Sequence, residues 1–207
     1  MKKVYIVGGN RQYTEMWVEN GFMLEPEPFK ADVVQFTGGE DVTPALYGQD
    51  RHPHTHNNPA RDEMELKIFS ECLLRGIPMV GICRGGQFLN VASGGSMWQH
   101  IGGHAVGGTH KARDERSLRV YQVSSTHHQM MIPASNAVLV GTAHCSTFKE
   151  DHHGNIPGND PLSTPDVEVV WYPQTRSLCF QPHPEFFDPT HPCQIWYYSL
   201  IKELIGL

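Results

Sequence analysis

The chain has 207 residues and a formal net charge of −6, with apolar residues at 39% and charged residues at 18%. This composition is typical of a soluble globular protein with one sizeable core, so we expect a single domain over residues 1–207. The acidic balance and the thin spread of Lys and Arg exclude a nucleic-acid surface, because phosphate binding needs a clustered basic patch.

The N-terminal segment and the cysteines indicate the cellular compartment of the protein. The apolar run in MKKVYIVGG is too short for a signal peptide, and no stretch is long enough to span a bilayer. We therefore expect a cytoplasmic protein that binds no membrane. The five cysteines are scattered and form no Cys-x-x-Cys pair, which argues against a disulfide framework.

The first half of the chain alternates short apolar strands with helices. We expect strands within residues 3–9, 31–42 and 77–82, and helices within residues 12–22, 61–76 and 86–93. The second helix carries two adjacent apolar rows: Met64, Ile68 and Cys72 in one, Leu66, Phe69 and Leu73 in the other. This alternation predicts an α/β fold with a mostly parallel central sheet flanked by helices.

The second half changes character. Strands are expected at residues 117–125, 137–143, 166–173 and 177–186, mostly with alternating polarity, which predicts a small antiparallel extension of the sheet. The last 16 residues, 192–207, predict an amphipathic helix that covers one face of the sheet. We interpret 46–62 and 149–166 as loops, and the charged stretch 110–119 as a solvated segment.

A cysteine stands where the strand 77–82 ends, in the sequence GICRGGQ. The pattern Gly-x-Cys-x-Gly-Gly between a strand and a helix is that of a nucleophile elbow, with Cys83 at the C-terminal edge of the sheet. The helix N-terminus favours the thiolate, and the backbone N–H of Arg84 would form one half of an oxyanion hole. The alternative is a small buried residue at a strand end. Core positions are expected for the other four cysteines: Cys72, Cys145, Cys179 and Cys193.

A thiol nucleophile needs an imidazole base and a group that orients it. The segment FQPHPEF offers His183 and Glu185, which should point to the same side at the end of a strand, between stiffening prolines. A surface histidine in a Pro-rich turn is the alternative.

Further motifs accompany this pair. GICRGGQ is followed about 100 residues later by HPE, and GGEDVTPALYG, RDEMEL, NVASGGSMWQHI and SSTHHQM occur around and between them. Together they resemble the class I glutamine amidotransferase family, and more narrowly its gamma-glutamyl hydrolase-type peptidases. The matches cover roughly residues 32–188 in family order. Because the region between GGEDV and RDEMEL is compact, we expect the loops around the leaving group to differ.

The resemblance implies a flavodoxin-like fold and a set of site residues. These are a catalytic triad of Cys83, His183 and Glu185, an oxyanion hole of Arg84 and Gly39, and substrate contacts by Gly38, Gln87, His127, His128 and Gln129. The two glycines could equally form a plain tight turn, and the histidine pair a polar strand end.

The resemblance leaves two activities open. The first is a cysteine hydrolase that cleaves a small gamma-glutamyl amide through a thioester on Cys83. The second is a glutaminase subunit that takes glutamine and delivers ammonia to a separate synthetase partner. GGEDVTPALYG and THHQ favour the first. The leaving amine and a homodimer stay open.

A third hypothesis is a metal-binding or regulatory module, because histidines alternate at His52, His54 and His56 and pair at His152 and His153. These spacings lack the closed four-ligand pattern of a structural zinc site. We therefore expect no metal and no cofactor.

Overall fold

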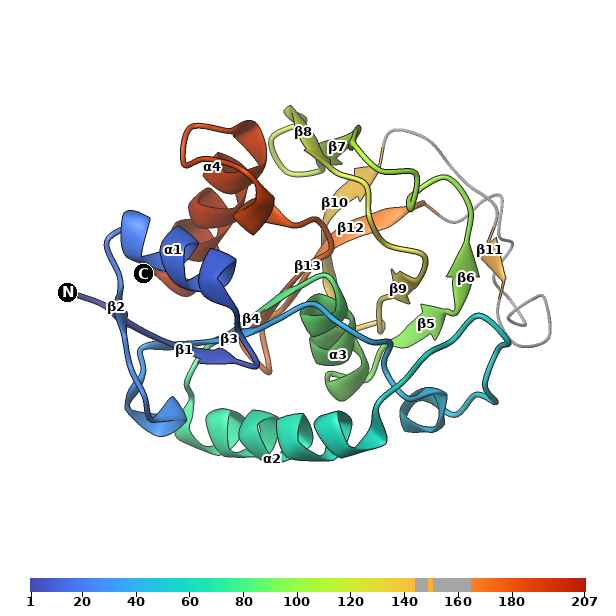
Figure 1. Ribbon diagram of the computed structural model, residues 1–207, viewed down its shortest axis with the longest axis horizontal. Coiled ribbons are helices and arrows are strands. Elements are labelled where there is room, and N and C mark those ends of the chain that lie inside the picture. Colours follow the sequence, from blue (N-terminus) through green and yellow to red (C-terminus); the bar gives the residue numbers. More distant parts are fainter. Residues whose placement is uncertain (144–148, 151–164) are drawn as a thin grey trace.

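The computed structural model describes residues 1–143, 149–150 and 165–207 (Figure 1). Its centre is a nine-stranded sheet in the order β2-β1-β3-β4-β13-β12-β10-β7-β8. In that order the strands are β2 (Met23–Leu24), β1 (Lys3–Val7), β3 (Val33–Phe36), β4 (Met79–Ile82), β13 (Ser177–Phe180), β12 (Val167–Tyr172), β10 (Val138–Ala143), β7 (Thr109–Asp114) and β8 (Val120–Ser124).

The sheet has a parallel and an antiparallel half. Neighbours from β2 to β13 pair in parallel, and those from β13 to β8 pair antiparallel. The expected α/β fold is confirmed, but β13 belongs to the parallel half, because it pairs with β4. The antiparallel part is continuous with the parallel part.

One strand differs from the expectation of a solvated segment at residues 110–119. Thr109–Asp114 forms β7, which lies between β10 and β8. Its charged residues Lys111 and Arg113 alternate with Ala112 and Asp114, which are buried. The segment follows the two-residue period of a strand, but its charged residues led us to expect a solvated segment.

Helices cover both faces of the sheet (Figure 1). On one face lie α1 (Arg11–Glu19), α4 (Pro192–Leu200) and the π-helical turn that continues α4; on the other lie α2 (Pro59–Arg75) and α3 (Arg84–Ala92). The first core lies between the sheet and α1 and α4, and the second core lies between the sheet and α2 and α3. Successive residues of β3 enter both: Val33 packs into the first core and Val34 into the second. Strands covered on both faces need continuous apolar runs, which is what the sequence carries here.

The helix α2 ends at Gly76 in the left-handed conformation, as expected. Its apolar rows are only partly buried: Met64 and Leu73 are 45% and 43% exposed, whereas Asp62 and Glu65 face inward. The two carboxylates pair with the buried Arg84 of α3, and this pairing sets the rotation of the helix.

Shorter elements complete the described residues. They are the strand pairs β5 (Ser96–Trp98) with β9 (Met130–Ile132) and β6 (His100–Ile101) with β11 (Lys149–Glu150), and the 3₁₀ turns at Pro28–Lys30, Pro44–Tyr47 and Pro184–Phe186. Among the described helices, none has the length and apolar character needed to cross a membrane. Cys145, His152 and His153 lie outside the described residues. Cys72, Cys179 and Cys193 are buried, as expected for core positions.

Candidate active site

Three neighbouring parallel strands, β3, β4 and β13, end at the same edge of the sheet (Figure 1). The chain continues from them into the turn 37–39, Cys83 and His183. These three segments lie close together: a Cβ placed on Gly38 would lie 3.0 Å from Cε1 of His183 and 3.7 Å from Cβ of Cys83. Open α/β sheets bind ligands at such carboxyl ends.

Cys83 occupies a sharp strand-to-helix turn. It precedes the first residue of α3 and has φ 51° and ψ −115°, a backbone conformation that residues other than glycine rarely adopt. The flanking glycines are required by packing: a Cβ on Gly81 would lie 2.3 Å from the Gly85 carbonyl, and one on Gly85 would lie 2.3 Å from the Phe36 carbonyl oxygen. The predicted elbow geometry is therefore present, and it holds Cys83 partly exposed at the sheet edge.

The imidazole of His183 lies beside the Glu185 carboxylate, with Nδ1 2.6 Å from Oε1. The two residues are joined by a 3₁₀ turn that starts at Pro184, so the turn sets their approach where a strand end was expected. The ring of Phe186 stacks on the imidazole at 4.4 Å, and the N–H of His183 donates to Oγ of Ser124. Glu185 and Phe186 thus fix the ring, and Ser124 holds the backbone of His183.

Charges around His183 favour its protonated form. Burial lowers the pKa of the imidazole, but interactions with Cys83 and Glu185 outweigh it and raise the pKa to about 10. Cys83 lies beside the imidazole, since a Cβ on Gly38 would approach both residues. Since Nδ1 is taken by Glu185, Nε2 is the ring nitrogen available to the thiol.

The side chain of Arg84 points away from Cys83 into the second core. It is 1% exposed and forms ion pairs with Asp62 and Glu65 of α2. Its peptide N–H is left at the N-terminus of α3, where backbone N–H groups have no intrahelical acceptor. This anchoring orients the peptide between Cys83 and Arg84.

The turn after β3 is held by two residues to which sequence reasoning assigned no role in the site. Gly38 donates its N–H to the hydroxyl of Tyr13 at 2.9 Å. Arg61 donates to the carbonyl oxygens of Thr37 at 2.9 Å and Gly38 at 3.1 Å. Arg61 lies in the motif RDEMEL, which was a usable signal, whereas Tyr13 appeared only as an apolar position of a helix. Burial, with the nearby Glu185 charge, raises the pKa of Tyr13 far above its ordinary value, so the hydroxyl stays protonated.

The expected substrate-contacting residues Gln87, His127 and Gln129 are buried. The amide of Gln87 donates to the Gln129 carbonyl and to Oε1 of Gln181. His128 is partly exposed, and its Nε2 lies 3.1 Å from Oδ1 of Asp41. Cys83, His183, Glu185, Arg84 and both glycines therefore gather at one edge, whereas Gln87, His127 and Gln129 belong to the interior beside it.

Metal-ligating side chains come together elsewhere. Within the described residues, the ligand atoms of His104, His110, His127 and Glu168 lie close enough to share one ion, and the alternating histidines 52, 54 and 56 are not part of such a group. Instead, the ring of His54 stacks on that of His100 at 4.5 Å.

Comparison with known proteins identifies relatives of this arrangement. The peptidase C26 family matches residues 29–155. A Mycobacterium tuberculosis protein assigned to the glutamine amidotransferases is 34% identical over 157 residues, which cover 67% of this chain and 49% of that protein. The gamma-glutamyl-gamma-aminobutyrate hydrolase of Escherichia coli is 30% identical over 127 residues, covering 61% and 49%. The chain thus spans about half the length of these two curated relatives.

Solved structures share the fold. A glutamine amidotransferase from Thermotoga maritima aligns with a TM-score of 0.62 at 16% identity, covering 100% of this chain and 86% of that one. The Thermotoga maritima PurLQS structure aligns with a TM-score of 0.63 at 16% identity, covering 100% and 92%. With more than half of its length matched by the family, the chain belongs to the peptidase C26 family of class I glutamine amidotransferase-like proteins.

Proposed function

We propose that the protein is a cysteine hydrolase that cleaves the gamma-glutamyl amide bond of a small gamma-glutamyl compound. The observation that carries the proposal is Cys83 on a strained strand-to-helix turn, beside the imidazole of His183, whose Nδ1 lies 2.6 Å from the Glu185 carboxylate. A nucleophile, a base and an orienting carboxylate in this order make up a catalytic triad.

The chemistry follows from the positions of the protons. The thiolate of Cys83 attacks the gamma-carbonyl carbon, and its proton resides on Nε2 of His183. When the C–N bond breaks, His183 gives this proton to the leaving amine, and a gamma-glutamyl thioester remains on Cys83. A water molecule then attacks the thioester with His183 as the base, which releases glutamate and restores the thiol.

The negative charge that develops on the carbonyl oxygen needs two N–H donors. Arg84 supplies one at the start of α3, where the helix dipole also favours an anion. Gly39 is the better candidate for the second, because the N–H of Gly38 already donates to Tyr13. The backbone of Gly39 has φ 145°, which a residue with a side chain rarely adopts.

The substrate class draws on the Escherichia coli relative, whose name specifies a gamma-glutamyl compound. The second candidate activity is release of ammonia from glutamine for a synthetase partner, favoured by the name of the Mycobacterium tuberculosis relative. Both use the same thioester on Cys83 and differ in the amine that leaves.

A panel of glutamine and several gamma-glutamylamines, incubated separately with the protein and with Cys83→Ala, tests the proposal. We expect turnover of at least one gamma-glutamylamine by the wild type, none by Cys83→Ala, and a gamma-glutamyl adduct on the Cys83 peptide by mass spectrometry. The exposed His54 offers a control, His54→Gln, which should keep wild-type turnover. Wild-type turnover by Cys83→Ala would contradict the mechanism, and turnover of glutamine alone would favour the ammonia donor.

A further inference from the structure

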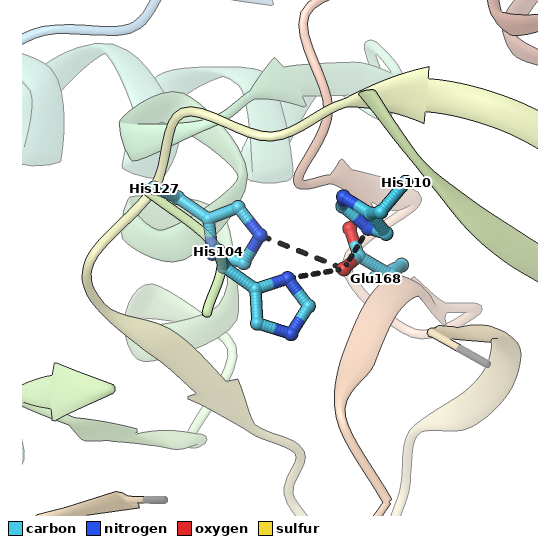
Figure 2. A group of neighbouring side chains, drawn as sticks. All are labelled: His104, His110, His127 and Glu168. Carbon is cyan, nitrogen blue, oxygen red and sulfur yellow. Dashed lines mark hydrogen bonds and ion pairs between the residues drawn. The ribbon is translucent and has the colours of Figure 1, made fainter. Parts of the chain in front are cut away.

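Four side chains meet in the interior beside the antiparallel half of the sheet (Figure 2). Glu168 lies on β12 and His110 on β7, while His104 precedes β7 and His127 follows β8. One ligand atom from each lies within 4.8 Å of all the others. His104, His127 and Glu168 are at most 2% exposed, so the group is closed to solvent on most sides.

The three spacings around Glu168 are compatible with a metal centre. Oε1 of Glu168 lies 2.9 Å from Nε2 of His110, 3.3 Å from Nδ1 of His104 and 3.5 Å from Nε2 of His127. A tetrahedron of Zn–N and Zn–O bonds of about 2.0–2.1 Å has edges of about 3.3–3.4 Å. The three imidazoles therefore approach one carboxylate oxygen at distances close to those edges.

In His104 and His127, one ring nitrogen faces Glu168 (inward) and the other faces away from it (outward). The hydrogen bond of the outward nitrogen determines whether the inward nitrogen carries a proton or a lone pair. Nδ1 of His127 lies 2.9 Å from the carbonyl oxygen of Gln129, which can only accept, so this nitrogen carries the proton. Nε2 of His104 lies 2.9 Å from the carboxylate of Asp166, which favours a proton there in the same way. In the neutral rings, the inward nitrogens then hold lone pairs.

Those lone pairs face a carboxylate in the interior. Among the described residues, neither Nδ1 of His104 nor Nε2 of His127 has a hydrogen-bond partner. Lone pairs that point at a carboxylate oxygen repel it unless a cation lies between them. One divalent ion would satisfy every inward atom, in place of protons on the inward nitrogens of two rings whose centroids lie 4.6 Å apart.

We propose that His104, His110, His127 and Glu168 bind one divalent transition-metal ion, with Zn²⁺ the best match to three imidazoles and one carboxylate. Asp166 and the Gln129 carbonyl then orient two of the ligands, as outer hydrogen-bond acceptors commonly do for metal-bound histidines. The carboxylates of Glu168 and Asp166 together balance the charge of the ion. Because the protein supplies all four ligands, the ion is structural and leaves no position for a substrate.

The site ties the antiparallel half of the sheet to the catalytic edge. The Gln129 carbonyl that orients His127 also accepts from the amide of Gln87, on the helix that begins after Cys83. The backbone carbonyl of Glu168 accepts the N–H of Gln181, two residues before His183. An ion that holds His127 and Glu168 together therefore braces both segments. This inference departs from the sequence-based expectation of no metal.

The first test is the metal content of tag-free protein, measured by elemental analysis after dialysis. We expect about one Zn²⁺ per chain, bound only through nitrogen and oxygen as seen by X-ray absorption spectroscopy. Cys83→Ala should retain the ion, which separates this site from zinc bound by the catalytic thiol. Reconstitution with Co²⁺ should give the visible absorption of a tetrahedral site.

Variants locate the ion. Glu168→Gln and His110→Ala should lose at least tenfold in zinc affinity, while His54→Gln, a change at an exposed histidine, should bind as the wild type does. Chelation of the wild type should lower its melting temperature by several degrees, and Zn²⁺ should restore it.

Three results would overturn the proposal. The first is a tag-free wild type that contains no metal and whose melting temperature does not respond to Zn²⁺, Co²⁺ or Ni²⁺; this result does not depend on whether any variant folds. The second is sulfur in the metal coordination shell, and the third is full zinc retention by Glu168→Gln.

Discussion

The hydroxyl of Tyr13 accepts the peptide N–H of Gly38 at 2.9 Å, and so links α1 to the turn that follows β3. Tyr13 is 4% exposed, and the charge of Glu185 is close enough to help raise its pKa, so this side chain lies between the proposed oxyanion turn and the proposed triad. The contact fixes the direction of the Gly38 N–H and so helps to define the orientation of the following Gly39 peptide.

Tyr13→Phe removes this acceptor and leaves the N–H of Gly38 without a partner in a partly buried place. An unmade hydrogen bond of this kind costs about 1–3 kcal/mol, so we expect kcat to fall about tenfold with little change in KM. Steady-state kinetics on the best gamma-glutamylamine measures the effect. Tyr121→Phe is the matched control, since Tyr121 stacks on Trp196 at a distance from the turn. Equal losses in both variants would contradict a positioning role for Tyr13.

Arg61 supports the same turn from α2. Its guanidinium bonds the carbonyl oxygens of Thr37 and Gly38 and the carboxylate of Glu65. Arg61→Lys keeps the charge but cannot make the planar set of contacts, so we expect kcat to fall about tenfold while the protein stays folded. Arg75→Lys, at an exposed position of the same helix, should leave kcat unchanged. A variant with normal kcat would show that the turn holds its shape without Arg61.

The protonation of His183 depends on its two partners. Its pKa is raised to about 10 although burial acts in the opposite direction, because Cys83 and Glu185 favour the charged ring. A folded-state pKa above the unfolded value means that His183 stabilises the fold fully below about pH 6.5, and that this contribution is lost as the pH rises through about 10.

We therefore expect Cys83→Ala and Glu185→Gln each to lower the pKa of His183, as followed by NMR titration of the imidazole nitrogens. The free energy of unfolding of these variants should also depend less on pH between about pH 7 and 10. A pKa of His183 unchanged in Cys83→Ala would show that the thiol contributes nothing to the charge of the ring.

The buried ion pairs of Arg84 join α3, the helix that begins after Cys83, to α2. Glu65 is fully buried and pairs with both Arg84 and Arg61, so Glu65→Ala leaves two guanidinium groups without this partner. Breaking a buried pair in this way costs about 3–5 kcal/mol of unfolding free energy, measurable by urea denaturation. Glu63→Ala, an exposed position on α2, should change it by less than about 0.5 kcal/mol. Similar values for the two variants would show that Arg84 is held by other contacts.

Local sequence patterns predicted the sharp turn at Cys83 and the pairing of His183 with Glu185. The strand and the helix approach each other so closely at Cys83 that no Cβ fits at Gly81 or Gly85. Glycine is therefore required at these positions, and the sequence pattern alone indicates the turn. His183 and Glu185 are two residues apart, so a single turn brings them together whatever the rest of the fold does. The strands β1, β3 and β4 of the parallel half were predictable for the same reason, because apolar runs and helix ends are local patterns, whereas β13 was expected in the antiparallel extension.

Only the tertiary structure decided the rest. β7 was hidden because its outward residues are charged, and its place between β10 and β8 depends on strand order. Tyr13 contacts Gly38 across 25 residues of chain through the packing of α1. His104 contacts Asp166 across 62 residues through the pairing of antiparallel strands. Spacing along the sequence carries no information about such contacts, since it is the sheet that sets which distant side chains face one another.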